Sequence, residues 1–359
     1  MNTLPFEGKH ILITGGTGSL GKTLVKRILS FELGEPKAIT IFSRDEGKHH
    51  QMQMNYNLEP NEELKERFRR IVKFRIGDVR DLSSLMPAVM QSNIIINTAA
   101  LKQVPSCEYY PTEAVKTNIM GAMNIVTCIS DHNTPVETVV CISTDKAAKP
   151  VNVMGMTKAV QERIFLQGTM LCPKVRFVGV RYGNVLSSRG SVVPVFHDLI
   201  KKGHDLTITD KNMTRFLMSL NDSVSLIFGA IKEGHTGELY IPNLPTAKMT
   251  DLAEVLIGDR PLKWVETGIR PGEKLHEVLI GEDEARKAFK RGDYFVIPSS
   301  LPEVLACYEG QEEAQPELLE QEYSSACNLI SKDELKKLLD KNGLLVENVD
   351  YQNDNELIR

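Results

Sequence analysis

The chain has 359 residues, of which 42% are hydrophobic and 25% are charged, and its formal net charge is -4. These proportions fit a globular protein with a full core and exclude a chain that is disordered throughout. Because the chain is slightly acidic and has no basic block, we expect no nucleic-acid partner. The N-terminus lacks a signal-peptide pattern, and no apolar run approaches the roughly 20 residues that span a bilayer. We therefore expect a cytoplasmic protein without a membrane partner.

Cysteine and histidine spacing predicts neither a disulfide framework nor a metal site. The six cysteines are scattered, and Cys141 lies in the apolar run 139–142, where it is expected to be a small core residue. His49 and His50 stand in a polar stretch without further ligands at metal spacing. We expect no metal.

The first half of the chain alternates apolar strands with amphipathic helices. Strands are expected at residues 10–14, 38–43, 72–77, 94–99, 138–143 and 175–182. Helices are expected at residues 20–31, 82–90, 114–130 and 153–166. This alternation predicts an α/β Rossmann fold with a doubly wound parallel sheet, covered on both faces. We assign residues 1–183 mainly to a nucleotide-binding domain.

The pattern changes after residue 183, where loops rich in Gly, Ser, Thr and Pro separate shorter elements. With expected strands at 206–209 and 238–241, residues 184–300 are predicted to form mainly a smaller substrate-binding lobe, interleaved with the sheet. Residues 301–359 form an acidic C-terminal tail, interpreted as a docked segment or a subunit contact. In this tail a capping box from Ser331 to Glu334 predicts a short helix, and Gly343 predicts its end.

A glycine-rich turn follows the first expected strand. Gly15 allows a tight turn, Gly18 allows close approach of a pyrophosphate, and Gly21 allows the helix to pack closely. An ordinary turn is the alternative, but the flanking strand and helix favour a dinucleotide site. The cofactor contacts expected here are Gly15, Thr17, Gly18, Ser19, Leu20 and Gly21.

The end of the second expected strand bears on the choice of cofactor. Ser43 and Arg44 can hold a 2′-phosphate, which favours NADP, whereas Asp45 leaves NAD possible as the less favoured cofactor. A solvated charged loop is the alternative. Asp78, after the third strand, can accept a hydrogen bond from the adenine amino group. The further cofactor residues we predict are Val79, Ala99, Ala100, Lys102, Asn118, Lys158 and Tyr182.

Around the fifth expected strand the sequence resembles the extended short-chain dehydrogenase/reductase family. The resemblance rests on the glycine turn, residues 97–100, Thr144 and Lys158. The family signature is Tyr-x-x-x-Lys, but Met154 stands here at the position of the Tyr. A core methionine on a helix face is the alternative interpretation of that residue.

A narrower resemblance, over residues 8–298, is to bacterial UDP-N-acetylglucosamine 4,6-dehydratases of capsule and glycan synthesis, many of which carry Met in place of Tyr. It is carried by Ser43-Arg44-Asp45-Glu46, Ala100-Leu101-Lys102-Gln103-Val104-Pro105, Ser143-Thr144-Asp145-Lys146-Ala147-Ala148, Arg181-Tyr182-Gly183-Asn184-Val185, Thr207-Ile208-Thr209-Asp210, Met213-Thr214-Arg215-Phe216 and Arg270-Pro271-Gly272-Glu273-Lys274.

This resemblance implies a three-step reaction with no net redox change. The sugar is oxidised at C4 by hydride transfer to tightly bound NADP, water is eliminated across C5 and C6, and the hydride returns to C6. The resemblance implies Asp145 as the acid and Lys146 as the base. A lysine base requires a lowered pKa, for which burial or the cations Lys102 and Lys158 are candidates.

The remaining catalytic assignments follow from the same resemblance. Thr144 is expected to bond the C4 hydroxyl, and Lys158 to hold the nicotinamide ribose one helical turn beyond Met154. Since Met154 cannot accept a proton, either Asp145 through water or water alone must deprotonate the C4 hydroxyl. We hypothesise the Asp145 route. A surface ion pair is the alternative interpretation of Asp145 and Lys146.

Arginines and backbone amides are expected to hold the UDP part of the substrate, because a guanidinium binds phosphate through two parallel hydrogen bonds. Ordinary surface arginines are the alternative. The substrate residues we predict are Lys102, Asn184, Arg189, Ser191, Val192, Arg215, Arg270 and Glu273.

Three functions stay open besides an inverting 4,6-dehydratase. The first is a 4,6-dehydratase that retains the C5 configuration; we favour inversion because the short capsule-type members are most similar. A UDP-sugar 4-epimerase shares the hydride transfer at C4 but needs no acid–base pair for elimination. A non-catalytic NADP-binding redox sensor fits the absence of the Tyr. We also expect a homo-oligomer, as is common for this fold.

Overall fold

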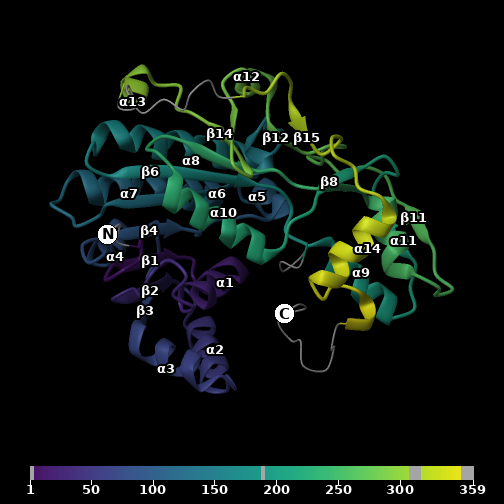
Figure 1. The fold of residues 1–359 in the computed structure, drawn as a ribbon, viewed down its shortest axis with the longest axis horizontal. Coiled ribbons are helices and arrows are strands. Elements are labelled where there is room, and N and C mark those ends of the chain that lie inside the picture. The colour runs from purple at the N-terminus through teal and green to yellow at the C-terminus, as the bar shows by residue number, and fades with distance from the viewer. Residues whose placement is uncertain (1–3, 187–190, 307–316, 349–359) are drawn as a thin grey trace.

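The computed structural model describes residues 4–186, 191–306 and 317–348. In these residues a single nine-stranded sheet dominates the fold (Figure 1). Its strands lie in the order β13 (Phe289–Arg291), β14 (Tyr294–Ile297), β9 (Leu239–Pro242), β6 (Arg176–Tyr182), β5 (Thr138–Thr144), β4 (Ile94–Asn97), β1 (His10–Thr14), β2 (Ala38–Ser43) and β3 (Val72–Ile76). From β9 to β3 neighbouring strands are parallel, and β14 and β13 add an antiparallel edge. The predicted α/β doubly wound sheet is confirmed.

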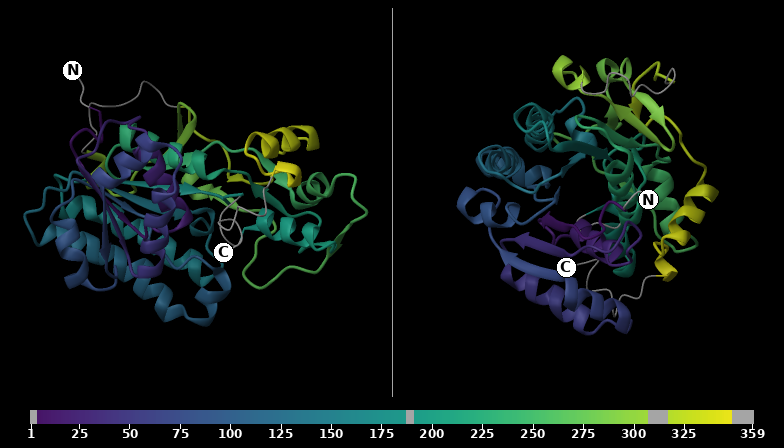
Figure 2. Two further views of the ribbon diagram at one scale, coloured as in Figure 1. Left: turned by 90° about the horizontal axis from the view of Figure 1, so that it is seen from below. Right: turned by 60° about the vertical axis from the view of Figure 1, so that its left-hand side comes forward.

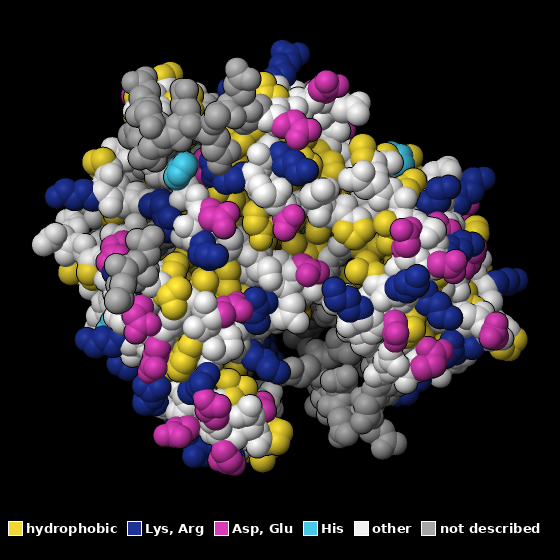
Figure 3. Space-filling model, viewed as in Figure 1, with side chains coloured by type: hydrophobic (Ala, Val, Ile, Leu, Met, Phe, Trp, Pro, Cys, Tyr) yellow, Lys and Arg dark blue, Asp and Glu magenta, His cyan; other side chains and the backbone are white. Residues whose placement is uncertain are grey.

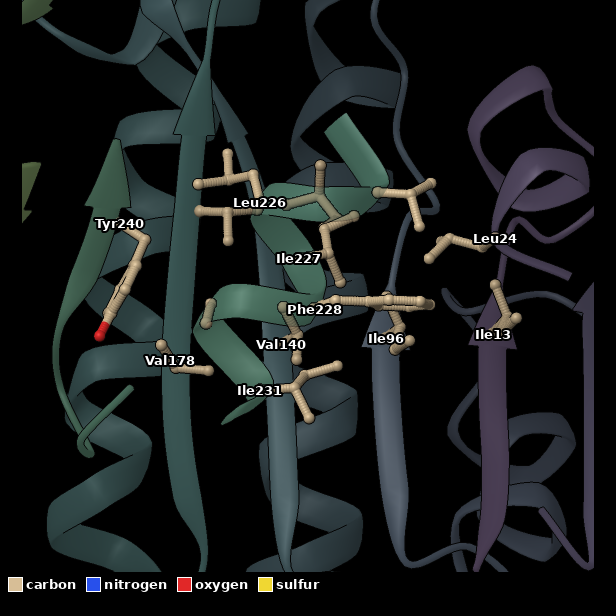
Figure 4. Packing of buried hydrophobic residues seen from close by; sticks show 14 of the residues in the cluster. Ile13, Leu24, Ile96, Val140, Val178, Leu226, Ile227, Phe228, Ile231 and Tyr240 are labelled. Carbon is tan, nitrogen blue, oxygen red and sulfur yellow. The ribbon is translucent and has the colours of Figure 1, made fainter. Parts of the chain in front are cut away.

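Helices cover both faces of this sheet. The helices α1 (Ser19–Ile28) and α10 (Leu220–Glu233) pack on one face, and α4 (Leu82–Val89), α7 (Gly121–Ser130) and α8 (Val153–Leu171) pack on the other. Successive side chains of a strand point to opposite faces, so Ile96 of β4 joins the cluster of α10 whereas Ile95 joins the cluster of α7. Figure 4 shows Phe228 of α10 lying over Ile96 and Val140. Burial on both faces explains the nearly continuous apolar strands of the sequence.

Some predicted boundaries differ from the structure. The helix expected at 114–130 consists of three segments, α6 (Pro111–Ala114), the π-helix η1 (Val115–Met120) and α7. Helix α8 continues five residues beyond the expected end at 166, to Leu171. The other helices outside the second lobe are α2 (Glu46–Asn57), α3 (Glu62–Ile71), α5 (Val104–Tyr109), the 3-10 helix η2 (Asp145–Ala147), α12 (Glu282–Ala285) and α13 (Pro302–Leu305).

A second lobe lies beside the sheet, on the right in Figure 1 and on the right in the left-hand view of Figure 2. It contains α9 (Val192–Lys201), α11 (Met249–Ile257), α14 (Lys332–Lys341), η4 (Val346–Asn348) and the strand pairs β7 (Leu206–Ile208) with β11 (Trp264–Glu266), β8 (Thr214–Phe216) with β10 (Thr246–Lys248), and β12 (Val278–Ile280) with β15 (Tyr323–Ser324). Of the two strands expected after residue 183, β7 lies in this lobe, whereas β9 joins the main sheet beside β6.

The C-terminal segment docks on the lobe of its own chain. Ser331 and Glu334 form the expected capping box, and Gly343 follows α14 with a φ of 65°. Leu335 and Leu339 of α14 are fully buried in a cluster with α9 and α11. The described part of the tail therefore packs against the lobe through these leucines. Across the described ranges, no helix is long and apolar enough to cross a membrane.

Candidate active site

Predicted site residues from six strands gather at the carboxyl edge of the main sheet, where parallel α/β sheets bind their ligands. The residues at or just after the ends of β1 to β6 are Gly15, Ser43, Asp78, Ala99, Thr144 and Tyr182. In the space-filling view the surface is recessed between the sheet and the second lobe (Figure 3). The site therefore lies between the two parts of the chain.

The glycine turn has the geometry of a dinucleotide cradle. Gly15 has a φ of +67°, and a Cβ there would lie 2.8 Å from Ala99 Cα. A Cβ on Gly21 would lie 2.4 Å from the carbonyl oxygen of Gly16, so the helix can pack on the turn only with glycine here. By contrast, the nearest atom to a Cβ on Gly18 is 3.4 Å away, and the N-terminus of α1 has no side-chain cap. Open space and uncapped amides, at a helix that Ser19 and Leu20 begin, fit a pyrophosphate.

Three hydrogen-bonded polar side chains lie beside this turn. Thr17 Oγ1 is 3.1 Å from Ser43 Oγ, and Ser43 Oγ is 2.6 Å from His49 Nε2. Burial lowers the pKa of His49, more than nearby Asp45 raises it, so the imidazole is neutral at neutral pH. Nothing in the sequence pattern signals this contact between His49 and Ser43, which lie six residues apart.

The charged residues after β2 and β3 have distinct partners. Asp45 caps α2 by accepting from the Lys48 amide at 3.0 Å. Asp78 accepts from Arg80 Nε at 2.8 Å, and its pKa is lowered because Arg80 outweighs the effect of burial. Arg44, with 56% of its side chain exposed, is 3.7 Å from Asp78. An exposed guanidinium thus stands at the place predicted for a 2′-phosphate.

Asn118 fixes the loop after β4 to helix α8. Its side chain accepts from the Leu101 amide at 2.8 Å, and donates to the Leu101 carbonyl and to Thr157 Oγ1, both at 3.0 Å. Ala100 and the exposed Lys102 flank this anchor. Asn118 therefore fixes the position of the loop after β4 relative to α8. Val79 packs against Gly121 at the start of α7.

A buried acid–base cluster forms at the end of β5. Thr144 Oγ1 donates to Asp145 Oδ1 at 2.8 Å, and Lys146 Nζ donates to the same oxygen at 3.0 Å. Lys146 Nζ also lies 3.3 Å from Glu277 Oε1, a residue of the second lobe. The side chain of Asp145 is only 1% exposed, so a surface ion pair is excluded. Among the described residues, Asp145 Oδ2 and Glu277 Oε2 are buried without a hydrogen-bond partner.

The expectation of a lowered pKa for Lys146 is wrong. Burial lowers this pKa, but the carboxylates of Asp145 and Glu277 outweigh burial, so the pKa is raised. The cation that opposes them is Arg215, not Lys102 or Lys158. Lys146 is consequently an ammonium in this structure.

Met154 and Lys158 lie on one face of α8 behind this cluster. Met154 is 6% exposed and packs with Cys107 and Ala114, as the core alternative predicts. Lys158 Nζ donates to the Ile142 carbonyl and to Gln161 Oε1, both at 2.5 Å. Burial lowers the pKa of Lys158.

The predicted substrate residues divide into two groups. Near the sheet, Asn184 Oδ1 is buried without a partner in the described residues, and Ser191 donates to the Leu186 carbonyl just before Val192 begins α9. The N-terminus of α9 has no side-chain cap. Arg189 lies outside the described residues.

The second group comes from the lobe. Arg215 donates to the carbonyls of Thr214 at 2.7 Å and Lys274 at 3.1 Å, and its Nε is 3.8 Å from Glu277 Oε1. Arg270 and Glu273 form a turn in which Glu273 Oε2 accepts from the Arg270 amide at 3.3 Å. The structure therefore brings Arg215 to the acid–base cluster and leaves Arg270 at an exposed turn.

Three residues of the cluster were missed from the sequence. Glu277 contacts Lys146, Lys274 Nζ donates to the Ala148 carbonyl at 2.7 Å, and Ser325 bonds the backbone of Glu277. The only signal for Glu277 was a charged residue directly before the apolar strand at 278–280. Such a residue is usually exposed.

The comparisons with known proteins show the family of this chain. The family model described as "Polysaccharide biosynthesis protein" matches residues 11–299. A Campylobacter jejuni protein named UDP-N-acetylglucosamine 4,6-dehydratase (inverting) is 41% identical over 299 residues, which are 82% of this chain and 84% of that protein. A Rickettsia bellii protein named UDP-glucose 4-epimerase is 39% identical over 342 residues, or 93% of this chain and 96% of that protein.

Two solved structures are similar to this chain in fold. Pen from Bacillus thuringiensis has a TM-score of 0.82 and 35% identity, covering 95% of this chain and 99% of that chain. DesIV, a dTDP-glucose 4,6-dehydratase from Streptomyces venezuelae solved with NAD and TYD bound, shares the fold at a TM-score of 0.64 and 18% identity, covering 74% of this chain and 86% of that chain.

Fold, glycine cradle and the cluster at the end of β5 define an enzyme of the extended short-chain dehydrogenase/reductase class. Within that class, the chain belongs to the polysaccharide biosynthesis protein family.

Proposed function

We propose that this enzyme is a UDP-N-acetylglucosamine 4,6-dehydratase that inverts C5 and produces a UDP-2-acetamido-2,6-dideoxy-hexos-4-ulose for bacterial surface glycans. One observation carries the proposal: the buried Asp145 and the half-buried Lys146 are adjacent and in contact just after the end of β5. Elimination of water needs an acid and a base close together, and this pair supplies both. The Campylobacter relative of that name supports the choice of reaction.

The proposed cofactor is tightly bound NADP. When bound, it accepts the hydride from C4 and returns it to C6. The glycine cradle would hold the pyrophosphate, Lys158 and Tyr182 would lie toward the nicotinamide end, and Arg44 with Ser43 would hold a 2′-phosphate. NADP is preferred over NAD because the Asp45 carboxylate accepts from an amide of α2 while the Arg44 guanidinium is exposed.

Asp145 is proposed to act in two steps. In the first, Thr144 orients the C4 hydroxyl and Asp145 accepts its proton through a water molecule, since Met154 cannot. In the second, Asp145 gives this proton to the departing C6 hydroxyl, while Lys146 removes the C5 proton, which the 4-keto group has acidified. Wild-type rates of hydride transfer in an Asp145→Asn enzyme would rule out the first step.

The UDP part of the substrate is assigned to the second lobe, mainly residues 184–300. The uncapped N-terminus of α9 supports an anionic ligand there, and the buried acceptor Asn184 Oδ1 supports a hydroxyl or N–H donor on the same ligand. The residues proposed to hold the substrate are Lys102, Asn184, Arg189, Ser191, Val192, Arg215, Arg270 and Glu273.

A UDP-sugar 4-epimerase is the second candidate, because Rickettsia relatives with that name align over 93% of the chain. An epimerase returns the hydride to C4 and never breaks the C6–O bond. It therefore has no use for the paired Asp145 and Lys146, and we rank it second.

The deciding experiment is NMR of the purified enzyme with UDP-N-acetylglucosamine in heavy water. We expect a 4-keto-6-deoxy product with deuterium at C5, and the proton couplings report whether C5 is inverted or retained. A C4 epimer with an intact C6 hydroxyl would establish the epimerase instead. Unchanged substrate with cofactor shown to be bound would exclude this sugar and favour a redox sensor.

We further propose that the enzyme is a cytoplasmic homo-oligomer. Apolar side chains of η1, α7 and α8 are exposed on one side of the sheet, with Met120, Met123, Met156 and Val160 each 41–50% exposed. A second copy would cover them. Light scattering of the purified chain tests this, and a monomer at micromolar concentration would contradict it.

A further inference from the structure

Lys146, the lysine of the acid–base pair, contacts a second carboxylate besides that of Asp145. Lys146 Nζ lies between Asp145 Oδ1 at 3.0 Å and Glu277 Oε1 at 3.3 Å. These carboxylates come from the end of β5 and from the segment before β12, more than a hundred residues apart in the sequence. Only 4% of the Glu277 side chain is exposed.

Glu277 is held at this position by several backbone bonds. Its amide donates to Ser325 Oγ at 2.9 Å, and its carbonyl accepts from the Ser325 amide at 2.7 Å. The same segment is tied to the sheet where Lys274 Nζ donates to the Ala148 carbonyl at 2.7 Å and Asn152 Nδ2 donates to the Gly272 carbonyl at 2.9 Å. A charge fixed so firmly against Lys146 is built into the site.

The proposed reaction needs a place for the proton of Lys146. Four charged groups face the Lys146 ammonium. They are Asp145 just after β5, Arg215 of β8, and Glu277 and Lys274 in the segment before β12. With the pKa of Lys146 raised, the resting side chain is protonated and cannot act as a base. In the proposed reaction Asp145 already carries the proton of the C4 hydroxyl, which leaves Glu277 as the free acceptor.

We propose that Glu277 is a positioning residue that acts through Lys146 and takes up its ammonium proton before elimination; this inference rests on the proposed dehydratase function. An N–H bond of Lys146 breaks and an O–H bond of Glu277 forms, giving a neutral amine and a neutral carboxyl. Because Glu277 Oε2 is buried without a partner in the described residues, this transfer removes a charge that is only partly compensated.

The protons of the full cycle balance. Lys146 takes the C5 proton, the C–H electron pair forms the C5–C6 double bond, and the C6–O bond breaks as its oxygen receives the proton held by Asp145. Water leaves, and the hydride adds to C6. C5 accepts a proton from solvent on the opposite face. Glu277 releases one proton to solvent, which restores the resting ion pair.

The test is the pH dependence of kcat in Glu277→Gln. In the wild type the proton moves within the pair, so kcat is expected to be flat around neutral pH. In E277Q the lysine must lose its proton to solvent. We expect kcat near pH 7 to fall at least about tenfold and to rise about tenfold per pH unit toward the wild-type value. KM is expected to stay within about twofold.

Two further variants make the result decisive. Glu277→Asp keeps the charge, so we expect a lower kcat with a flat profile, a result that remains readable if E277Q does not fold. Glu282→Gln makes the same change at an exposed carboxylate paired with Lys149, and should match the wild type. A flat profile in E277Q at any level, or a rising one in E277D, overturns the inference. A wild type that forms no dehydrated product overturns the proposed function itself.

Discussion

Ser325 holds the backbone of Glu277 through two hydrogen bonds: the Ser325 amide donates to the Glu277 carbonyl at 2.7 Å, and the Glu277 amide donates to Ser325 Oγ at 2.9 Å. Ser325 Oγ also lies 2.7 Å from Thr214 Oγ1, in the residue next to Arg215. One fully buried serine of the C-terminal segment therefore joins strand β8, which carries Arg215, to the segment before β12, which carries Glu277.

Replacing this hydroxyl should damage both stability and chemistry. In Ser325→Ala the amide of Glu277 loses its acceptor, and a buried unpaired amide costs about 1–3 kcal/mol. We expect that loss in urea unfolding, together with a lower kcat at nearly unchanged KM. The neighbouring, half-buried Ser324 provides the control as Ser324→Ala, which should change either quantity little. Equal effects of the two variants would contradict the special role of Ser325.

The glycine turn allows stability and cofactor binding to be separated. A Cβ at Gly21 would collide with the backbone of Gly16, so Gly21→Ala should destabilise the fold by about 1–3 kcal/mol. Gly18→Ala meets no atom closer than 3.4 Å and should fold normally, but its methyl group would project toward the pyrophosphate. We expect G18A to weaken cofactor binding at least about tenfold in a fluorescence titration. Tight binding by G18A would place the dinucleotide elsewhere.

Arg44 should determine the preference for NADP. Because a guanidinium contributes roughly 1.5–3 kcal/mol to a charged hydrogen bond, Arg44→Ala should bind NADP about tenfold or more weakly, with little change for NAD. Lys48, an exposed cation beside Asp45, is the matched control as Lys48→Ala. The measurement is equilibrium titration of apo-protein with each dinucleotide. An equal loss of affinity for NADP and NAD would show that Arg44 does not bind the 2′-phosphate.

A buried ion-pair network behind β5 should make stability depend on acid pH. Arg181, 2% exposed, is paired with Glu162 at 2.7 Å and Glu284 at 2.7 Å. Burial raises the pKa of Glu284, but Arg181 outweighs burial and holds it below the ordinary 4.5. The contribution of this pair is therefore present above about pH 4.5 and is lost as the pH falls further.

We accordingly expect Glu284→Gln to be less stable than the wild type near pH 7, by about 1–3 kcal/mol, and the difference to shrink below about pH 4. Urea unfolding at both pH values measures it. The exposed Glu282→Gln serves as the control, and should show no such convergence. A difference that is constant with pH would mean that Glu284 contributes through packing alone.

The sequence predicted the fold, and it predicted which residues follow the strand ends, because both are encoded locally. Gly15 and Lys146 lie at the ends of apolar strands, and the ends of parallel strands meet at one edge. Glu277 and Ser325 reach the cluster only through tertiary contacts, and a charged or hydroxyl residue in a loop carries no local signal of burial. The direction of the Lys146 pKa was mispredicted because Asp145 and Glu277 together outweigh burial, and the contact with Glu277 has no local signal in the sequence. Asn118 was assigned to the cofactor, yet its contacts anchor a loop, a distinction that needs atomic positions.

The pairing of β15 with β12 has a practical meaning for anyone who trims or recombines this enzyme. A shortened chain ending near residue 300, where the family match stops, would keep every strand of the main sheet and the whole glycine cradle. It would, however, lose the hydrogen bonds of Ser325 to Glu277 and the buried leucines of α14. Such a fragment should still bind a dinucleotide while failing at catalysis, so the catalytic unit should extend at least through Leu344, which is buried in the lobe.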